Sequence, residues 1–147
     1  MRILEKIITS VLSTLIFSLS LAFLEYTPVA EQQAGIGYNS LEGLYILYFF
    51  YSFPIYLLGG GFYSYLVDVY FDIIQFRNEF LKYIIGFLVY VAGGLLVVGV
   101  LSVIILLTDG GTGGLLTFGA LMFGALAALL FYHISLISKK ALKLFAR

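Results

Sequence analysis

Residues 83–107 read YIIGFLVYVAGGLLVVGVLSVIILL, and this stretch decides the fold because it contains no Asp, Glu, Lys or Arg. Three more stretches share this property, at residues 7–24, 44–67 and 115–137. At about 1.5 Å per residue, each can cross a hydrocarbon core about 30 Å thick as a helix. None shows the alternating pattern of a barrel strand, and an unpaired strand would leave its backbone unsatisfied in lipid. The sequence predicts an all-α membrane protein with four transmembrane helices.

Composition leads to the same class of protein. Hydrophobic residues make up 62% of the 147 residues and charged residues 11%, whereas a soluble domain has about 45–50% apolar and about 25% charged residues. The excess apolar surface needs lipid as its solvent, and we expect one polytopic membrane domain over residues 1–147. The chain has no basic domain for nucleic acid. It has no cysteine, which excludes disulfides, thiolate catalysis and cysteine-ligated metals.

The basic residues predict the orientation of the helices. All eight lie at the N-terminus, between the second and third spans, or at the C-terminus: Arg2, Lys6, Arg77, Lys82, Lys139, Lys140, Lys143 and Arg147. The first connection, residues 25–43, and the third, residues 108–114, contain none and carry acidic residues instead. Because positive charges stay on the cytoplasmic side, both termini are predicted to be cytoplasmic. The predicted location is a cell membrane.

The first span has a second interpretation. Basic residues, an apolar stretch and then Ser20-Leu21-Ala22 match the layout of a cleaved signal peptide. The apolar stretch is longer than the usual core of about 7–15 residues, and it has a packing face that a discarded leader does not need. We therefore expect the segment to be retained, with cleavage as the alternative.

Small residues predict close helix packing. They recur every fourth position in the first span, and the third and fourth spans are rich in glycine and alanine. Lipid drives helix association only weakly, so close backbone approach and interhelical hydrogen bonds matter more. We expect packing within one chain, with a homo-oligomer as the alternative. The residues concerned are Ser10, Thr14, Ser18 and Ala22, then Gly86, Gly93, Gly94 and Gly99, then Gly119, Ala120, Gly124, Ala127 and Ala128.

The second span has a different character. Aromatic residues crowd it between Tyr45 and Tyr65, Pro54 lies inside it, and residues 59–61 are three glycines. Proline removes a backbone donor and glycine lowers helix propensity, so we expect a kink or a break. The tyrosines are expected at the membrane interfaces or against glycines of other helices. The alternative is a discontinuous helix that lines a binding site, as in transporters.

The three connections carry weaker signals. The first is flexible and acidic, and we expect it to join two spans, with partner recognition as the alternative. The third, TDGGTGG at residues 108–114, resembles a phosphate loop but lacks the lysine, which favours a tight hairpin. In the second, residues 68–82 have the spacing of an amphipathic surface helix. Asp68 and Asp72 lie one turn apart there, and we expect solvated carboxylates and no metal site. Residues 139–147 are expected to contact anionic lipid headgroups.

Recognisable catalytic chemistry is missing. His133 is the only histidine, and a metal site or proton relay needs further ligands or a partner that the spans do not supply. We expect a structural role for His133, with pH sensing as the alternative. The hydroxyl groups of the first span have no nearby base. The sequence therefore predicts no enzyme, no cofactor, and no catalytic or metal-binding residue.

The layout of the chain resembles that of a known class of membrane proteins, which implies a bacterial source but no mechanism. The basic N-terminus before a hydroxyl-rich span, the motif Tyr48-Phe49-Phe50-Tyr51 with Pro54, and the glycine-rich last pair of spans resemble small uncharacterised four-span membrane proteins of bacilli. This resemblance implies a bacterial plasma membrane. We expect an accessory or interaction protein, for example one that confers immunity to a membrane-active toxin or regulates another membrane protein. The alternative is a small oligomeric channel or transporter, and a partner membrane protein or a second copy of the chain is the expected contact.

Overall fold

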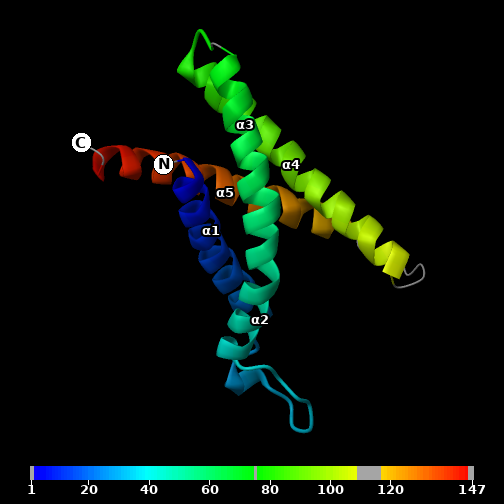
Figure 1. The fold of residues 1–147 in the computed structure, drawn as a ribbon. Helices are drawn as coiled ribbons and strands as arrows, with labels where there is room; N and C mark the ends of the chain where they lie inside the picture. Colours follow the sequence, from blue (N-terminus) through cyan, green and yellow to red (C-terminus); the bar gives the residue numbers. More distant parts are fainter. Residues whose placement is uncertain (1, 75, 109–116, 146–147) are drawn as a thin grey trace.

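The computed structural model describes residues 2–74, 76–108 and 117–145, which form helices joined by short connections (Figure 1). No strand occurs in these residues, so the all-helical prediction is confirmed for them. In chain order the elements are α1 (Arg2–Glu25), η1 (Val29–Glu31), α2 (Leu41–Pro54), η2 (Ile55–Gly61), α3 (Phe62–Ile73), α4 (Glu79–Thr108) and α5 (Phe118–Phe145).

Four helical segments of the described chain are long and apolar enough to cross a membrane, namely Ile3–Glu31, Leu41–Ile73, Glu79–Thr108 and Phe118–Leu142. The first three cover the charge-free stretches 7–24, 44–67 and 83–107 and extend past their ends. The fourth covers residues 118–137 of the last stretch, of which residues 115 and 116 lie outside the described residues. Large apolar side chains stay on the outside, such as Phe50 at 72% exposure and Leu58 at 71%. A surface of this kind suits an apolar solvent better than water.

The helices cross one another and do not form a parallel array (Figure 1). Helix α1 packs against α2, η2 and α5, and α4 packs along α5. The first turns of α1 lie beside the C-terminal half of α5, and the end of α3 reaches the same place. The beginning of the first long helix and the ends of the second and fourth therefore meet at one end of the bundle.

The small face of α1 is buried, as predicted. Ser10, Thr14, Ser18 and Ala22 are each 0% exposed. The backbone of η2 comes close to this face, because a Cβ added to Gly61 would lie 3.3 Å from the Ser10 Oγ. This face packs within one chain, and retention of the segment after synthesis stays a prediction.

Helices α4 and α5 touch through glycine and alanine. A Cβ added to Gly94 would lie 2.7 Å from the Cβ of Ala128 and would also overlap the backbone carbonyl of Gly124. The predicted close approach is therefore confirmed at these positions. Gly99 and Gly119 were expected to take part, but a Cβ at Gly99 would meet nothing within 4 Å and one at Gly119 would meet only Thr117, at 3.8 Å. They lie on the same helices but outside the contact.

The second long helix is widened where a kink or break was predicted. Segment η2 has π-helical hydrogen bonding and connects α2 to α3 without interruption. The backbone is right-handed helical at Pro54 before η2, at Ile55, its first residue, and at Phe62 after it. Proline has no backbone N–H to donate, and in a π-helix each hydrogen bond joins residues five apart instead of four. The helix therefore continues past Pro54 with a wider turn. The widened turn takes the place of the expected break.

The predicted surface helix over residues 68–82 is wrong. Residues 68–73 are the last turns of α3, Ile74 is extended, and α4 begins at Glu79. The Asn78 side chain accepts a hydrogen bond from the Phe80 backbone N–H at 3.0 Å, which caps α4. The alternating charges of this region therefore belong to the ends of two long helices.

The first connection runs from the end of α1 to the start of α2 and contains the single turn η1. The Ser40 side chain accepts a hydrogen bond from the backbone N–H of Gly43 at 3.1 Å and caps α2. The Tyr48 hydroxyl donates to the carboxylate of Glu25, which joins the two helices at this end. Of the third connection, only Thr108, at the end of α4, belongs to the described residues.

Candidate functional site

Three helices bring charged side chains together at one end of the bundle. The Lys6 Nζ of α1 lies 2.5 Å from Oδ2 of Asp68 on α3 and 3.2 Å from Oε1 of Glu5. The Lys139 Nζ of α5 donates to the other Asp68 oxygen at 2.6 Å. The Ser135 hydroxyl donates to Glu5 at 3.3 Å. We call these five residues the ion-pair cluster.

The ion-pair cluster is largely shielded from solvent. The exposed side-chain fraction is 6% for Lys6, 9% for Glu5, 15% for Asp68 and 34% for Lys139. Its two carboxylates and two ammonium groups balance in formal charge. Buried charges are costly to desolvate, so such a cluster is tolerable only when every member keeps its partners. Asp68 is central because it contacts both lysines.

The expectation of solvated carboxylates at this position is wrong for Asp68. The sequence argument paired Asp68 with Asp72, whereas the structure pairs it with lysines of two other helices. One signal was present in the sequence. Lys6 lies one turn before Ser10 and so extends the buried small face of α1 toward the N-terminus. Lys139 was expected at lipid headgroups, and its bond to Asp68 directs it into the bundle.

A charged cavity of about 620 Å³ adjoins the ion-pair cluster. Residues from α1, α3, α4 and α5 line it, so it lies between these four helices at this end of the bundle. Acidic, basic and tyrosine side chains share its wall. The lining includes Glu5, Asp68, Asp72, Glu79, Lys82, Tyr83, Tyr90, Tyr132, Ser135, Lys139 and Lys140.

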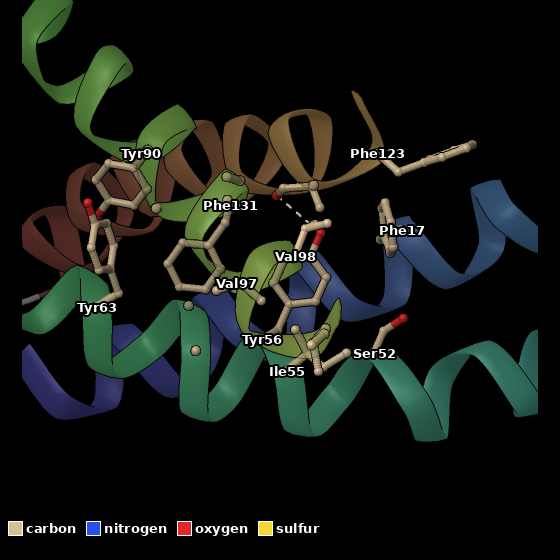
Figure 2. A pocket seen from close by; sticks show the side chains of 18 of the residues that line it. Phe17, Ser52, Ile55, Tyr56, Tyr63, Tyr90, Val97, Val98, Phe123 and Phe131 are labelled. Atoms are coloured by element: carbon tan, nitrogen blue, oxygen red, sulfur yellow. Dashed lines mark hydrogen bonds between the residues drawn. The ribbon is translucent and has the colours of Figure 1, made fainter. Parts of the chain in front are cut away.

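An apolar cavity of about 280 Å³ lies in the middle of the bundle. Figure 2 shows the rings of Tyr56 and Phe131 stacked inside it, with Tyr63 and Tyr90 at one end and Phe17 at the other. The ring centroids of Tyr56 and Phe131 are 5.9 Å apart. Gly60 of η2 makes room for the Phe131 ring, and Gly93 of α4 makes room for the Tyr63 ring. Because Tyr90 lines both cavities, the apolar cavity abuts the charged one.

Tyrosines join the helices around these cavities. The Tyr132 ring covers Gly86, where an added Cβ would lie 2.6 Å from its hydroxyl oxygen, and the Tyr63 ring covers Gly93. Both hydroxyls donate to carbonyl oxygens of α4, Tyr132 at 3.0 Å and Tyr63 at 2.8 Å. The Tyr56 hydroxyl donates to a carbonyl of α5 at 3.1 Å. The prediction that tyrosines of the second span lie against glycines of other helices is confirmed for Tyr63.

His133 contacts neighbours on two helices but lies outside the ion-pair cluster. Its Nδ1 is 2.8 Å from the carbonyl oxygen of Leu129, and its Nε2 is 3.1 Å from the Tyr83 hydroxyl. Because a carbonyl only accepts, Nδ1 carries a proton, and in the neutral ring Nε2 accepts from Tyr83. This geometry positions the ring as a link between α4 and α5. The alternative of pH sensing stays a prediction.

Ser135 and the acidic side chains are the candidates for catalytic or metal-binding chemistry among these groups. Ser135 is 3.5 Å from the Lys6 Nζ, but this ammonium is paired with two carboxylates and is a poor base. Within residues 2–74, 76–108 and 117–145, no three His, Asp or Glu side chains are placed to hold one metal ion. The bundle therefore has a charged cavity at one end and an apolar cavity in its middle.

No protein-family model, curated protein or solved structure matches the chain. The resemblance to four-span membrane proteins of bacilli, and with it a bacterial source, therefore stays a prediction.

Proposed function

We propose that the chain is a multi-pass protein of the bacterial cell membrane, with four transmembrane helices and both ends in the cytoplasm. The four long apolar helices support the spans. The meeting of the first turns of α1 with the ends of α3 and α5 supports an even number of crossings. Four lysines lie at that same end, namely Lys6, Lys82, Lys139 and Lys140, which supports its cytoplasmic side.

Within this membrane the protein acts as an accessory or interaction protein and not as an enzyme. One observation carries this choice over a channel, namely the apolar lining of the central cavity. The Tyr56 and Tyr63 hydroxyls are already bonded to backbone carbonyls of neighbouring helices, and the Tyr90 hydroxyl is bonded to the Ser64 hydroxyl. A solute route needs water and polar groups along its length. The apolar centre therefore favours a protein that binds a partner at its outer surface over one that conducts a solute.

The surface toward a partner is the outside of the bundle together with the first connection. The connection carries Glu31 and two glutamines, and the residues between α1 and α2 are mostly exposed. A role in immunity to a membrane-active toxin, or in regulation of another membrane protein, fits a small protein of this layout. The charged cavity is the observation that favours the competing class, a small oligomeric transporter, because it offers polar groups at one end.

The test compares partner capture with solute flux in the same cells. A photo-crosslinking residue replaces Gln33 in the first connection, and a second variant carries it at Leu58 on the outer face of η2. The accessory role predicts a specific crosslinked membrane protein from at least one position and unchanged leakage of ions. Flux that depends on the protein, without any crosslinked partner, would overturn the proposal in favour of a transporter.

A further inference from the structure

We propose that the apolar cavity binds one uncharged lipophilic molecule of about the size of two aromatic rings, whose carbonyl-type acceptor takes a hydrogen bond from the Ser52 hydroxyl. This binding site goes beyond the accessory role. It rests on the proposed insertion in the membrane only for the route by which the ligand enters.

Ser52 carries a buried hydroxyl at the wall of this cavity. The residue is 7% exposed, and its side chain lies at the end of the cavity where Phe17 lies (Figure 2). Ser10 shows that a serine of this bundle can bond the carbonyl oxygen four residues earlier. The Ser52 hydroxyl makes no such bond and has no other partner among the described residues. Because buried donors are almost always paired, the free O–H favours an acceptor inside the cavity.

The other hydroxyls of the lining already have partners. Those of Tyr56, Tyr63 and Ser102 donate to backbone carbonyl oxygens at 3.1, 2.8 and 2.8 Å. The Tyr90 hydroxyl is bonded to that of a serine on α3. Among the described residues that line the cavity, Ser52 is therefore the hydroxyl left to orient a ligand, and its position fixes where the polar atom of the ligand lies.

The rest of the wall determines the class and size of the ligand. The described lining contains no charged side chain, and a charge buried without a partner is costly, so the ligand is uncharged. Aromatic rings, aliphatic side chains and glycines make up most of the wall, including Phe17, Val97 and Phe131. Small-molecule sites typically combine such walls with a few placed polar groups. The volume of about 280 Å³ is nearly twice that of a cavity of about 150 Å³ that accepts benzene.

The wall also reaches the outer surface of the bundle. Ile55 and Phe123 line the cavity and are exposed on the molecule. In the proposed orientation this outer surface contacts the acyl chains of the bilayer, where uncharged lipophilic molecules concentrate. The ligand therefore enters from the bilayer, past these two side chains, and does not cross the charged end.

The experiment uses benzophenone, which has two rings and one carbonyl acceptor and attaches to neighbouring C–H bonds under ultraviolet light. The purified full-length protein in detergent is titrated with the probe and irradiated, and mass spectrometry of its peptides identifies the labelled residues. We expect saturable labelling, at one probe per chain, of residues that line the cavity, such as Ile55 and Val97. Labelling that does not saturate and spreads over the exposed helix faces would overturn the site.

Two serine variants test the hydrogen bond. Ser52→Ala should weaken benzophenone binding about fivefold, which is the effect of one ordinary hydrogen bond. Ser102→Ala is the matched control, because it removes a lining hydroxyl that is already bonded to the Val98 carbonyl, and it should leave binding unchanged. Equal binding by the wild-type protein and Ser52→Ala would contradict the hydrogen bond.

A competitor without the carbonyl separates the hydrogen bond from a change of shape. Diphenylmethane has the same two rings joined by a methylene group. The wild-type protein should prefer benzophenone to diphenylmethane about fivefold more strongly than Ser52→Ala does, for the same reason. The same preference in both proteins would overturn the role of Ser52 in selecting the ligand.

A volume variant tests the cavity itself. Val97→Phe fills the cavity and should abolish saturable labelling. Val100→Phe is the control, since Val100 is exposed on the same helix and does not line the cavity. Far-ultraviolet circular dichroism confirms that each variant keeps its helices, and full labelling of a folded Val97→Phe would overturn the site. Because these measurements contain no partner protein, their failure is distinguishable from a failure of the accessory role.

Discussion

The charged end and the apolar middle of the bundle hold the same helices together by opposite means. At the end, Asp68 attracts lysines from α1 and α5, and the interaction depends on specific atoms at specific distances. In the middle, Gly93 of α4 lies against the Tyr63 ring and Gly60 of η2 against the Phe131 ring, and the interaction depends on shape. The end selects which helices meet, and the middle sets how closely they approach. Substitutions in the two regions should therefore lower the free energy of unfolding by different amounts and for different reasons.

The largest effect is expected at the end. Asp68→Ala leaves Lys6 with the Glu5 carboxylate alone and removes the carboxylate to which Lys139 is bonded. Losing one member of a fully buried pair costs about 3–5 kcal/mol, and the partial exposure of Lys139 reduces this to about 2–3 kcal/mol. The measurement is the free energy of unfolding in mixed micelles with increasing dodecyl sulfate, followed by helical circular dichroism.

The control for this change is Glu31→Ala, which removes an exposed carboxylate from η1 and should leave stability nearly unchanged. If Asp68→Ala and Glu31→Ala behave alike, the ion-pair cluster does not join the helices.

An intermediate effect is expected in the middle. Gly94→Ala places a methyl group against Ala128 and the backbone of Gly124, which should separate α4 from α5 and cost about 1–3 kcal/mol, as overpacking does. Gly99→Ala lies on the same helix in open space and should be neutral or slightly stabilising, because alanine favours helix. Both are measured in the same dodecyl sulfate titration. Equal stability of the two variants would contradict close packing at Gly94.

The smallest effect separates two serines on one buried face. The Ser10 hydroxyl is 2.8 Å from the carbonyl oxygen of Lys6 and 3.1 Å from that of Tyr56, so Ser10→Ala loses a bond worth about 0.6 kcal/mol in a membrane protein. The Ser13 hydroxyl is equally buried and has no partner among the described residues. Ser13→Ala should therefore leave the unfolding free energy unchanged or raise it. A loss on Ser13→Ala greater than on Ser10→Ala would contradict these assignments.

The helices were predictable because the absence of charge over residues 83–107 and its three counterparts is a local property of the sequence. The buried face of α1 was predictable because Ser10, Thr14 and Ser18 repeat with the helical period. The ion-pair cluster was not, since Lys6 and Asp68 lie just outside the charge-free stretches and far apart along the chain. Their pairing is decided by how α1 and α3 pack.

The second long helix shows a further limit. Pro54 and the three glycines indicate a disturbance, but they do not decide between a break, a kink and a π turn. That choice depends on contacts of η2 with α1 and α5, such as the approach of Gly61 to Ser10. Residues 68–82 misled for a related reason, since the ends of two helices have the same alternation of charged and apolar residues as one surface helix.

Topology mapping tests the central claim most directly. Single cysteines replace Ser40, Asn78, Thr112 or Ala146 in this cysteine-free chain, and an impermeant thiol reagent is applied to intact cells. Four spans with the ion-pair cluster on the cytoplasmic side predict labelling at positions 40 and 112 only, with 78 and 146 labelled after the membrane is permeabilised. Labelling of 78 or 146 in intact cells would contradict the orientation and the cytoplasmic placement of the ion-pair cluster.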